Sequence, residues 1–490
     1  MPTSSSSMIR SCFLALYKDL EAYRAGKPIC LDGKSLSIAA MVAVSRYAVD
    51  PQLDESVEAR DRVRSSRAPI EEAIQANQSI YGVTTGVGGS AGSKSTDVLT
   101  LGVAILQQIQ CGILAPEPSD GILPINHPQA ATVMPESWVR GALLTHINNL
   151  ARGYSGIRWD VIEAMYQILK ANIIPLVPLR GSVSASGDLT PLSFLAGTIV
   201  GNPYIRVYTG PPGARIVSNA QEALAQAGIT PMVFQAKEPL SMVNGTSYSA
   251  STAAIICYEA VQLSLLSLVC TALAVEGLNG YKGSFAPFIH DVARPHPGQI
   301  EVAEGIRYLL EPSELAQDRN SVTEDRGQLL QDRYALRTSP QYLGPQFEDI
   351  YSATKSVEIE CNSCTLPFSL EDLCADLEYT ATDNPLIEAA TGTIHMGGNF
   401  QAMSITNAME KTRLALFHIG KNLFAQSTEL NNPQMSNGLP PSTAATNPSL
   451  DYHTKGLDVT MASYVAELGF LANPVGTHNQ SVEMHNQGIK

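Results

Sequence analysis

Residues 181–194 read GSVSASGDLTPLSF, and they decide how the rest of the chain is interpreted. Three serines stand among glycines and an alanine at the start of this stretch. A hydrolase nucleophile would sit in a G-x-S-x-G turn with a basic partner, and this stretch has neither the pattern nor an adjacent base. An activated serine nucleophile is therefore a poor explanation of Ser186.

The tripeptide Ala185-Ser186-Gly187 offers another chemistry, in which the backbone closes on itself. Attack of the Gly187 nitrogen on the carbonyl carbon of Ala185 would form a five-membered ring. Loss of two waters, one of them carrying the Ser186 hydroxyl, would leave a methylidene group on an imidazolone. Glycine is the least hindered backbone nucleophile, and it tolerates the compressed φ/ψ of such a turn. The product would be an electrophile. Because A-S-G is a common tripeptide, the surrounding residues must decide.

The composition of the chain limits which partners and cofactors the protein could have. The chain of 490 residues carries 46 acidic and 32 basic side chains, a formal net charge of −14. This balance argues against a nucleic-acid partner, because phosphate binding needs a basic surface. The eight cysteines are scattered and the nine histidines form no ligand cluster, so we expect free thiols and no catalytic metal. The apolar run before Lys18 is too short for a secretory leader, so we expect a cytoplasmic protein.

The pattern along the chain predicts one large, mainly helical body with a mixed N-terminal part. Linkers are missing after residues 1–10, which are Ser-rich and expected to be disordered. Helices are predicted at 402–430 and 456–472, where apolar residues recur at three- and four-residue spacing. Polar residues interrupt the very apolar span 251–276, which predicts a buried bundle helix rather than a membrane span. A chain with 16% charged residues and such helices favours packing between subunits.

The segment QSIYGVTTGVGGSAGS at 78–93 predicts a lid, because its glycines permit positive φ and close approach to a ligand. Residues 86–91 within it satisfy G-x-G-x-x-A, the fingerprint of dinucleotide sites. No buried strand precedes them, and no acidic residue stands about 20 positions further on. We therefore reject a nucleotide cofactor.

The surroundings of the tripeptide match a known family. VPLRGSVSASGDLTPLSFLAG resembles the segment from which the histidine and aromatic amino acid ammonia-lyases build 4-methylidene-imidazol-5-one (MIO). Further stretches match in the same order: YGVTTGVGG (81–89), MVNGTS (242–247), GSFAPFIHDVARPHPGQIEVA (283–303), QDRYALRTSPQYLGP (331–345), TDNPLI (382–387), GGNFQA (397–402) and SVEMHNQ (481–487). The agreement is closest to the fungal phenylalanine ammonia-lyases.

This resemblance implies a fold and an assembly. The fold is mainly α, with a long central helical bundle and a smaller mixed MIO-bearing region, the L-aspartase/fumarase-like ammonia-lyase architecture. The expected division is an N-terminal segment at 1–30, an MIO domain at 31–200 with a mobile loop at Tyr81, and a bundle domain at 201–490, with no shielding domain. The family forms homotetramers whose active sites are shared between chains, so we expect one here, with neither nucleic-acid nor membrane partners.

The resemblance also implies roles for individual residues. Tyr81 would be the base that removes the β-proton, and it needs help because tyrosine ordinarily ionises near pH ~10. Arg337 would hold the substrate carboxylate as a bidentate fork. The other implied residues are Ala185, Ser186 and Gly187 forming MIO, Asn244 and Gln331 orienting carboxylate and MIO, Tyr334 relaying a proton, Phe400 packing near MIO, Asn384 as support, and Glu483, Asn486 and Gln487 as the far wall.

A pair on the helix after the lid sets selectivity in the family, and here it is Gln108-Ile109. Ile109 favours a phenyl ring, because an imidazole would leave its nitrogens unpaired. Gln108 could hydrogen-bond a phenolic hydroxyl, so tyrosine stays open as a substrate. The leading hypothesis is elimination of ammonia from L-phenylalanine to give trans-cinnamate. The alternatives are an MIO-dependent 2,3-aminomutase and a catalytically silent paralogue, the latter motivated by the unusual pair and by the end of the chain at Lys490.

Overall fold

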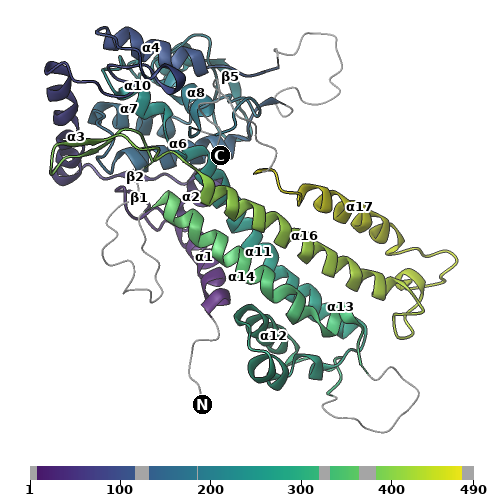
Figure 1. The fold of residues 1–490 in the computed structure, drawn as a ribbon. Coiled ribbons are helices and arrows are strands. Elements are labelled where there is room, and N and C mark those ends of the chain that lie inside the picture. Colours follow the sequence, from purple (N-terminus) through teal and green to yellow (C-terminus); the bar gives the residue numbers. More distant parts are fainter. Residues whose placement is uncertain (1–7, 116–131, 185, 319–330, 363–381, 477–490) are drawn as a thin grey trace, which may run out of the picture. The chain divides into compact units, whose positions relative to one another are not determined.

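The computed structural model describes residues 8–115, 132–184, 186–318, 331–362 and 382–476, and this part of the chain is mainly helical (Figure 1). The longest strands that it describes have only four residues. The mainly helical fold class predicted from the sequence is confirmed. The first helix, α1 (Met8–Arg24), begins inside the segment 1–10 that was expected to be disordered, so that expectation is wrong from Met8 onward.

Residue contacts divide the chain into two compact units, each built from separate stretches of sequence. Of the described residues, those within 19–255 and 356–406 and Gly476 form the mixed unit, and those within 8–18, 256–355 and 407–475 form the bundle unit. Among the helices that the structure describes, four supply residues to both units: α1, α11 (Ser247–Gly277), α14 (Ser339–Cys361) and α16 (Met403–Asn431). The predicted division at residues 30 and 200 stays a prediction.

The mixed unit is built around α6 (Glu136–Leu150), in which every residue from 139 to 150 is buried. Its other helices are α2 (Ile38–Tyr47), α3 (Val57–Gln75), α4 (Val98–Ile109), α7 (Trp159–Lys170), α8 (Leu189–Ile199), α9 (Ala220–Gln226) and α10 (Glu238–Val243). Several of these helices have a side-chain cap at the N-terminus. Asp97, for example, accepts a hydrogen bond from Thr100 N at 3.1 Å and so satisfies one of the free amides at the start of α4.

All the strands that the structure describes belong to the mixed unit. β1 (Cys30–Leu31) pairs in parallel with β2 (Gln52–Leu53), whereas β3 (Ile174–Pro175), β4 (Arg206–Thr209) and β5 (Ile216–Asn219) form an antiparallel sheet, as do β6 (Leu386–Glu388) and β7 (Thr393–His395). β6 matters most for the site. Its Ile387 lies in one buried cluster with Ile70 of α3 and with Ile80 and Val83, which flank Tyr81.

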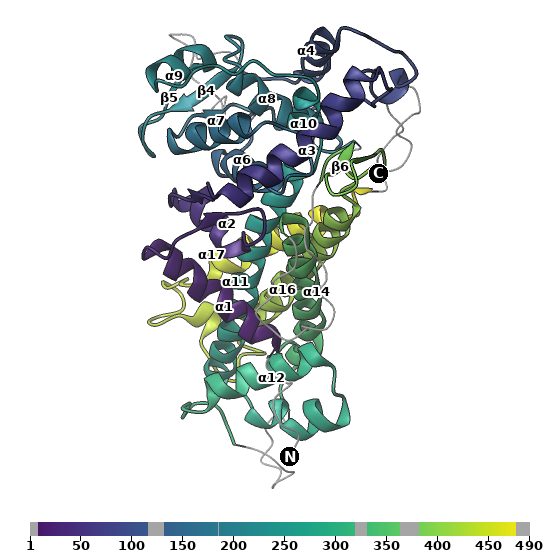
Figure 2. The same ribbon diagram turned by 90° about the vertical axis from the view of Figure 1, so that its left-hand side faces the viewer.

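In the bundle unit, α11, α14 and α16 lie side by side in both views (Figure 1, Figure 2). Phe13 of α1 stacks near Phe347 of α14, with ring centroids 5.7 Å apart. The Gln426 side chain of α16 donates to Thr271 Oγ1 of α11 at 3.1 Å. This unit also contains α12 (Pro297–Leu310), α13 (Tyr334–Arg337) and α17 (Lys455–Leu471), and the helices predicted at 402–430 and 456–472 are confirmed as α16 and α17.

The segment Glu238–Gly277, which joins α10 to α11, is long and apolar enough to cross a membrane by length and composition. Within the described residues it is the one segment with this property. More than half of its most apolar window, 56%, is buried inside the protein. Such burial is typical of a core helix, and it agrees with the bundle helix predicted at 251–276.

Candidate active site

A cavity of about 230 Å³ lies within the mixed unit, where five stretches that are far apart in the sequence come together. Its lining residues are Tyr81, Val87, Gly88, Ile105, Gln108, Ile109, Ser186, Leu189, Leu240, Val243, Asn244 and Phe400. Site residues predicted from the sequence are prominent among them: Tyr81, Gln108, Ile109, Ser186, Asn244 and Phe400. The remaining side chains are apolar, so a hydrophobic group would be favoured inside.

The backbone turns sharply on both sides of Ala185, a residue that itself lies outside the described part. Ser184 has φ +52° and Gly187 has φ +82°, both in the left-handed region. A Cβ atom added to Gly187 would stand 2.5 Å from Gly245 O, so only glycine fits there. The next amide, Asp188 N, donates to the same carbonyl oxygen at 2.7 Å. Residues 187 and 188 are thus held against Gly245.

Asp188 is a buried carboxylate directly after the tripeptide, and it was missed in the sequence analysis. It accepts hydrogen bonds from Ser249 N at 2.8 Å, from Ser249 Oγ at 2.6 Å and from Ser184 Oγ at 2.7 Å. Burial raises the pKa of Asp188, and these hydrogen bonds oppose the rise. The one feature of the sequence that could have pointed to Asp188 is its place between Gly187 and the start of α8.

Tyr81 sits on the glycine-rich segment between α3 and α4, and its phenol oxygen accepts a hydrogen bond from Gly88 N at 2.8 Å. The segment also bonds to itself. Thr84 N donates to Ile80 O at 3.0 Å, and Ser95 N donates to Thr84 O at 2.9 Å. These contacts fix the phenol at the cavity in this conformation. The expected movement of the segment as a lid stays a prediction.

Gln108 and Ile109 end α4 and line the cavity together. The following residue, Gln110, donates from Nε2 to Ser193 O of α8 at 3.0 Å and accepts from Asn202 Nδ2 at 3.2 Å. Gln110 therefore ties the end of α4 to the helix that starts just after the tripeptide. Sequence reasoning did not find this contact, because Gln110 and Ser193 are 83 positions apart and meet only in the folded unit.

Asn244 caps the C-terminal end of α10 and is 3% exposed. Its Oδ1 atom is buried and has no hydrogen-bond partner within the described residues. Asn384 is also buried, and the same holds for its Oδ1. Asn384 does not line the cavity, whereas Asn244 does. Asn244 thus combines a place in the cavity lining with a buried side-chain oxygen that lacks a partner, an arrangement that calls for an explanation.

Gln331, Tyr334 and Arg337 belong to the bundle unit, where they form a cluster of their own. Arg337 Nη1 donates to Gln331 Oε1, and the guanidinium lies 4.8 Å from the centroid of the Tyr334 ring. Tyr334 is 71% exposed. The predicted residues Ala185, Glu483, Asn486 and Gln487 lie outside the described residues.

A family model described as aromatic amino acid lyase matches residues 36–366 and 373–490. The chain belongs to the aromatic amino acid lyase family. This lyase-family chain is 52% identical to phenylalanine ammonia-lyase 2 of Pleurotus ostreatus over 495 aligned residues, which cover 100% of the chain and 64% of that relative. The chain therefore spans less than two thirds of the length of that protein.

Solved structures agree with this assignment. The crystal structure of phenylalanine ammonia-lyase from the yeast Rhodosporidium toruloides is similar to this lyase-family chain with a TM-score of 0.84 and 41% identity, over 96% of this chain and 65% of that one. A tyrosine aminomutase from Streptomyces globisporus is also similar, with a TM-score of 0.79 but only 26% identity, over 94% of this chain and 82% of that one. The ammonia-lyase architecture expected from the sequence is therefore confirmed.

Proposed function

We propose that this chain carries the active site of an MIO-dependent phenylalanine ammonia-lyase, which eliminates ammonia from L-phenylalanine to give trans-cinnamate. The observation that carries the proposal is the meeting of Tyr81, Ser186 and Asn244 at one apolar cavity in a member of the aromatic amino acid lyase family. The 52% identity to a phenylalanine ammonia-lyase supports this substrate.

The residues around the tripeptide fit a prosthetic group made from Ala185, Ser186 and Gly187. Left-handed φ angles at Ser184 and Gly187 place a tight turn there, as ring closure between residues 185 and 187 needs. The Oδ1 of Asn244, a cavity-lining residue, is buried without a hydrogen-bond partner, as expected of an acceptor whose partner would be a bound group. Inside the described residues, no His, Cys, Asp and Glu side chains gather in a group of three or more that could hold a metal ion.

The group supplies an electrophilic carbon that makes the substrate amine a better leaving group. Tyr81 takes the β-proton, and its fixed position beside the cavity gives the proton transfer the advantage of orientation. Arg337 and Gln331 bind the carboxylate, with Asn244 orienting it, and Tyr334 relays the amine proton. Phe400 would pack against the ring of the prosthetic group, and Asn384 would support the wall. The assigned far wall is Glu483, Asn486 and Gln487.

The cavity lining supports an aromatic substrate. Ile105, Ile109, Leu240 and Val243 offer an apolar surface on which a phenyl ring loses water without leaving polar atoms unpaired. Gln108 is the polar side chain at the end of α4, and we propose that it gives the site some activity on L-tyrosine by accepting the phenolic hydrogen.

We further propose a homotetramer. α17 has no buried residue, although it carries apolar side chains such as Leu457, Val459 and Phe470. α11 also exposes a row of apolar side chains: Leu263, Leu266, Val269 and Leu273. Exposed apolar faces on long helices are typical of surfaces that pack against other subunits. Light scattering on the purified chain tests this, and a monomer that turns over substrate would contradict it. The cytoplasmic location stays a prediction.

Incubation with phenylalanine, tyrosine and histidine in separate reactions, followed by mass identification of the products, tests the function. Trans-cinnamate from phenylalanine is expected, and β-phenylalanine as the main product would instead favour an aminomutase. Intact mass tests the prosthetic group, because its formation removes two waters, about 36 Da, from the chain. A Ser186→Ala variant should keep its full mass, fold normally and lose nearly all turnover. If the unmodified chain keeps its full mass, with no water lost, and makes no product, it is a silent paralogue.

A further inference from the structure

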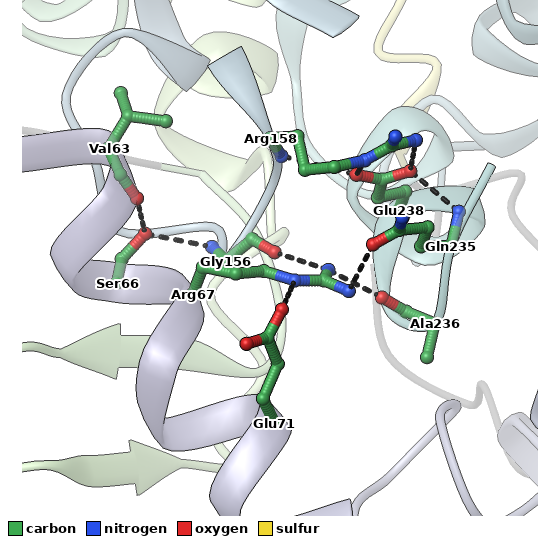
Figure 3. Close-up of polar contacts among 9 residues, drawn as sticks. All are labelled: Val63, Ser66, Arg67, Glu71, Gly156, Arg158, Gln235, Ala236 and Glu238. Carbon is green, nitrogen blue, oxygen red and sulfur yellow. Dashed lines mark hydrogen bonds and ion pairs between the residues drawn. The ribbon is translucent and has the colours of Figure 1, made fainter. Parts of the chain in front are cut away.

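The first residue of α10 and the residues directly before it are held by two arginines from other parts of the mixed unit (Figure 3). Arg158 donates from Nε and Nη2 to the two carboxylate oxygens of Glu238, at 2.6 and 2.7 Å. Arg67 donates from Nη1 to Ala236 O at 2.7 Å and from Nη2 to Gln235 Oε1 at 3.2 Å. The start of α10 is therefore fixed by hydrogen bonds from charged groups, which are stronger than those between neutral groups.

Between these contacts stands Lys237, whose side chain is fully buried and whose φ is +73°. Its Nζ lies 2.9 Å from Asp383 Oδ2 and 2.9 Å from Ser241 Oγ, one turn further along α10. Ser241 Oγ in turn donates to Ser155 O at 2.8 Å. Burial lowers the pKa of Lys237, and the charge of Asp383 and its hydrogen bond oppose this.

The segment that carries Asp383 also touches the other end of α10. Thr246 N donates to Thr382 Oγ1 at 3.2 Å, and a Cβ atom added to Gly245 would stand 2.7 Å from Thr382 O. Thr382 is itself bracketed by Asn149 of α6, which donates to Thr382 O at 3.0 Å and accepts from Thr382 N at 3.1 Å. One anchored segment, residues 382–383, therefore holds α10 at both ends.

The contacts of Lys237 and of residues 382–383 hold α10, which forms part of the cavity wall. Leu240, Val243 and Asn244 of α10 line the cavity, and Gly245 makes the contacts to Gly187 and Asp188 described above. A buried ion pair adds little net stability compared with apolar side chains of the same size, and a left-handed lysine is strained. A charge pair does, however, fix direction and distance more narrowly than an apolar contact.

We propose that Lys237 is a positioning residue for the lyase reaction, and that its ion pair with Asp383 holds α10 so that Gly245 keeps its contacts with Gly187 and Asp188 and Asn244 stays in the cavity wall. This inference rests on the proposed function. Lys237 does not line the cavity and acts through α10 alone. Without the pair, the wall shifts while the rest of the mixed unit stays folded.

The test uses the full chain with the double substitution Lys237→Met and Asp383→Asn. Both partners are made neutral together, because a single change would leave one buried charge unpaired and strongly destabilise the fold. The Asp383→Asn change keeps a side-chain oxygen that can accept the hydrogen bond from Asn384 N. Arg140→Met is the matched control, since Arg140 is a buried cation of the same unit whose acceptors, Val44 O, Leu169 O and Asn172 Oδ1, lie outside the cavity lining.

Three quantities are measured for each protein: the thermal midpoint, the fraction of chains that have lost two waters, and kcat and KM for phenylalanine. We expect the double variant to stay folded, to show a lower dehydrated fraction, and to lose at least ~10-fold in kcat per dehydrated site with KM within ~3-fold. The control should lose thermal stability but keep kcat per dehydrated site. A folded double variant with the dehydrated fraction and kcat of the unmodified chain overturns the inference.

Two other results would also be informative: a double variant that does not fold, and an unmodified chain without activity. If the double variant does not fold, Ser241→Ala removes one contact of Lys237 Nζ and should lower kcat several-fold, roughly as expected for one displaced wall group, and unchanged kcat overturns the inference. An unmodified chain that makes no cinnamate refutes the proposed function instead. The dehydrated fraction still tests Lys237 in that case, because backbone cyclisation needs no substrate.

Discussion

The phenol oxygen of Tyr81 accepts a hydrogen bond from the backbone nitrogen of Gly88, 2.8 Å away, and both residues line the same cavity. Gly88 has φ +53°, in the left-handed region that glycine adopts without strain. A backbone N–H can only donate, so it stabilises negative charge on the phenol oxygen. This donor gives the proposed base part of the help that a tyrosine needs.

A Tyr81→Phe variant should therefore separate prosthetic-group formation from turnover. It removes only the phenol oxygen, so the chain should still lose two waters, while kcat should fall by roughly 10²–10⁴, the usual loss on removing a positioned base. Intact mass and the absorbance of cinnamate measure the two effects. Tyr166→Phe, which loses a bond to Pro51 O away from the cavity, should keep its turnover. Turnover of Tyr81→Phe within twofold of the unmodified chain would exclude Tyr81 as the base.

Gly187→Ala should block cyclisation through a steric clash. Gly187 and Gly213 share the same φ of +82°, but a Cβ on Gly213 meets no atom within 4 Å, whereas one on Gly187 meets Gly245 O at 2.5 Å. Gly213→Ala should thus cost only the backbone strain, about 1 kcal/mol of unfolding free energy, and keep the dehydrated mass. Gly187→Ala should keep the undehydrated mass. Equal dehydration in both variants would show that the contact with Gly245 is unimportant.

Gln108→Leu should lower activity on tyrosine more than activity on phenylalanine. If Gln108 accepts the phenolic hydrogen, its loss leaves that hydroxyl unpaired, which reduces kcat/KM for tyrosine about 10-fold or more. The phenyl ring of phenylalanine makes no such bond, so its kcat/KM should change little. Gln107→Leu is a suitable control, because Gln107 is exposed on the same helix and does not line the cavity. An unchanged ratio of the two kcat/KM values would mean that Gln108 does not contact the substrate.

The short motifs of the sequence predicted the part of the site that depends on local chemistry. Ser186, Tyr81 and Asn244 each stand in a recognisable stretch, and they meet at one cavity. The residues that hold this wall were not predictable in the same way. Lys237 and Asp383 are 146 positions apart, and their pairing appears only when α10 and the segment before β6 come together. Apolar spacing predicted α16 and α17, since it is a local property, but a lysine with positive φ contradicts local preference and follows from tertiary contacts.

The stability of the bundle unit should depend on pH through Glu429 of α16, which is 4% exposed and lines a polar pocket of about 280 Å³ with Asp332 and Arg333. Burial raises the pKa of Glu429 from its ordinary value of 4.5 to about 7, with Arg333 opposing and Asp332 adding to the rise. The folded state thus holds this proton more tightly than the unfolded state. Its contribution to stability is complete below about pH 4.5, falls between pH 4.5 and 7, and is lost above pH 7.

Glu429→Gln keeps the shape of the protonated carboxyl and removes its titration. Relative to the unmodified chain, the variant should gain stability as pH rises from 5 to 7.5, by at most about 3 kcal/mol, and the gain should then level off. At pH 5 the two proteins should unfold at nearly the same temperature. Thermal midpoints measured from pH 5 to 9 follow this difference, and Glu222→Gln, at an exposed position of α9, should give a curve parallel to that of the unmodified chain. A parallel curve for Glu429→Gln would mean that Glu429 is ionised in the folded protein across this range, and that water or a cation in the pocket compensates its charge.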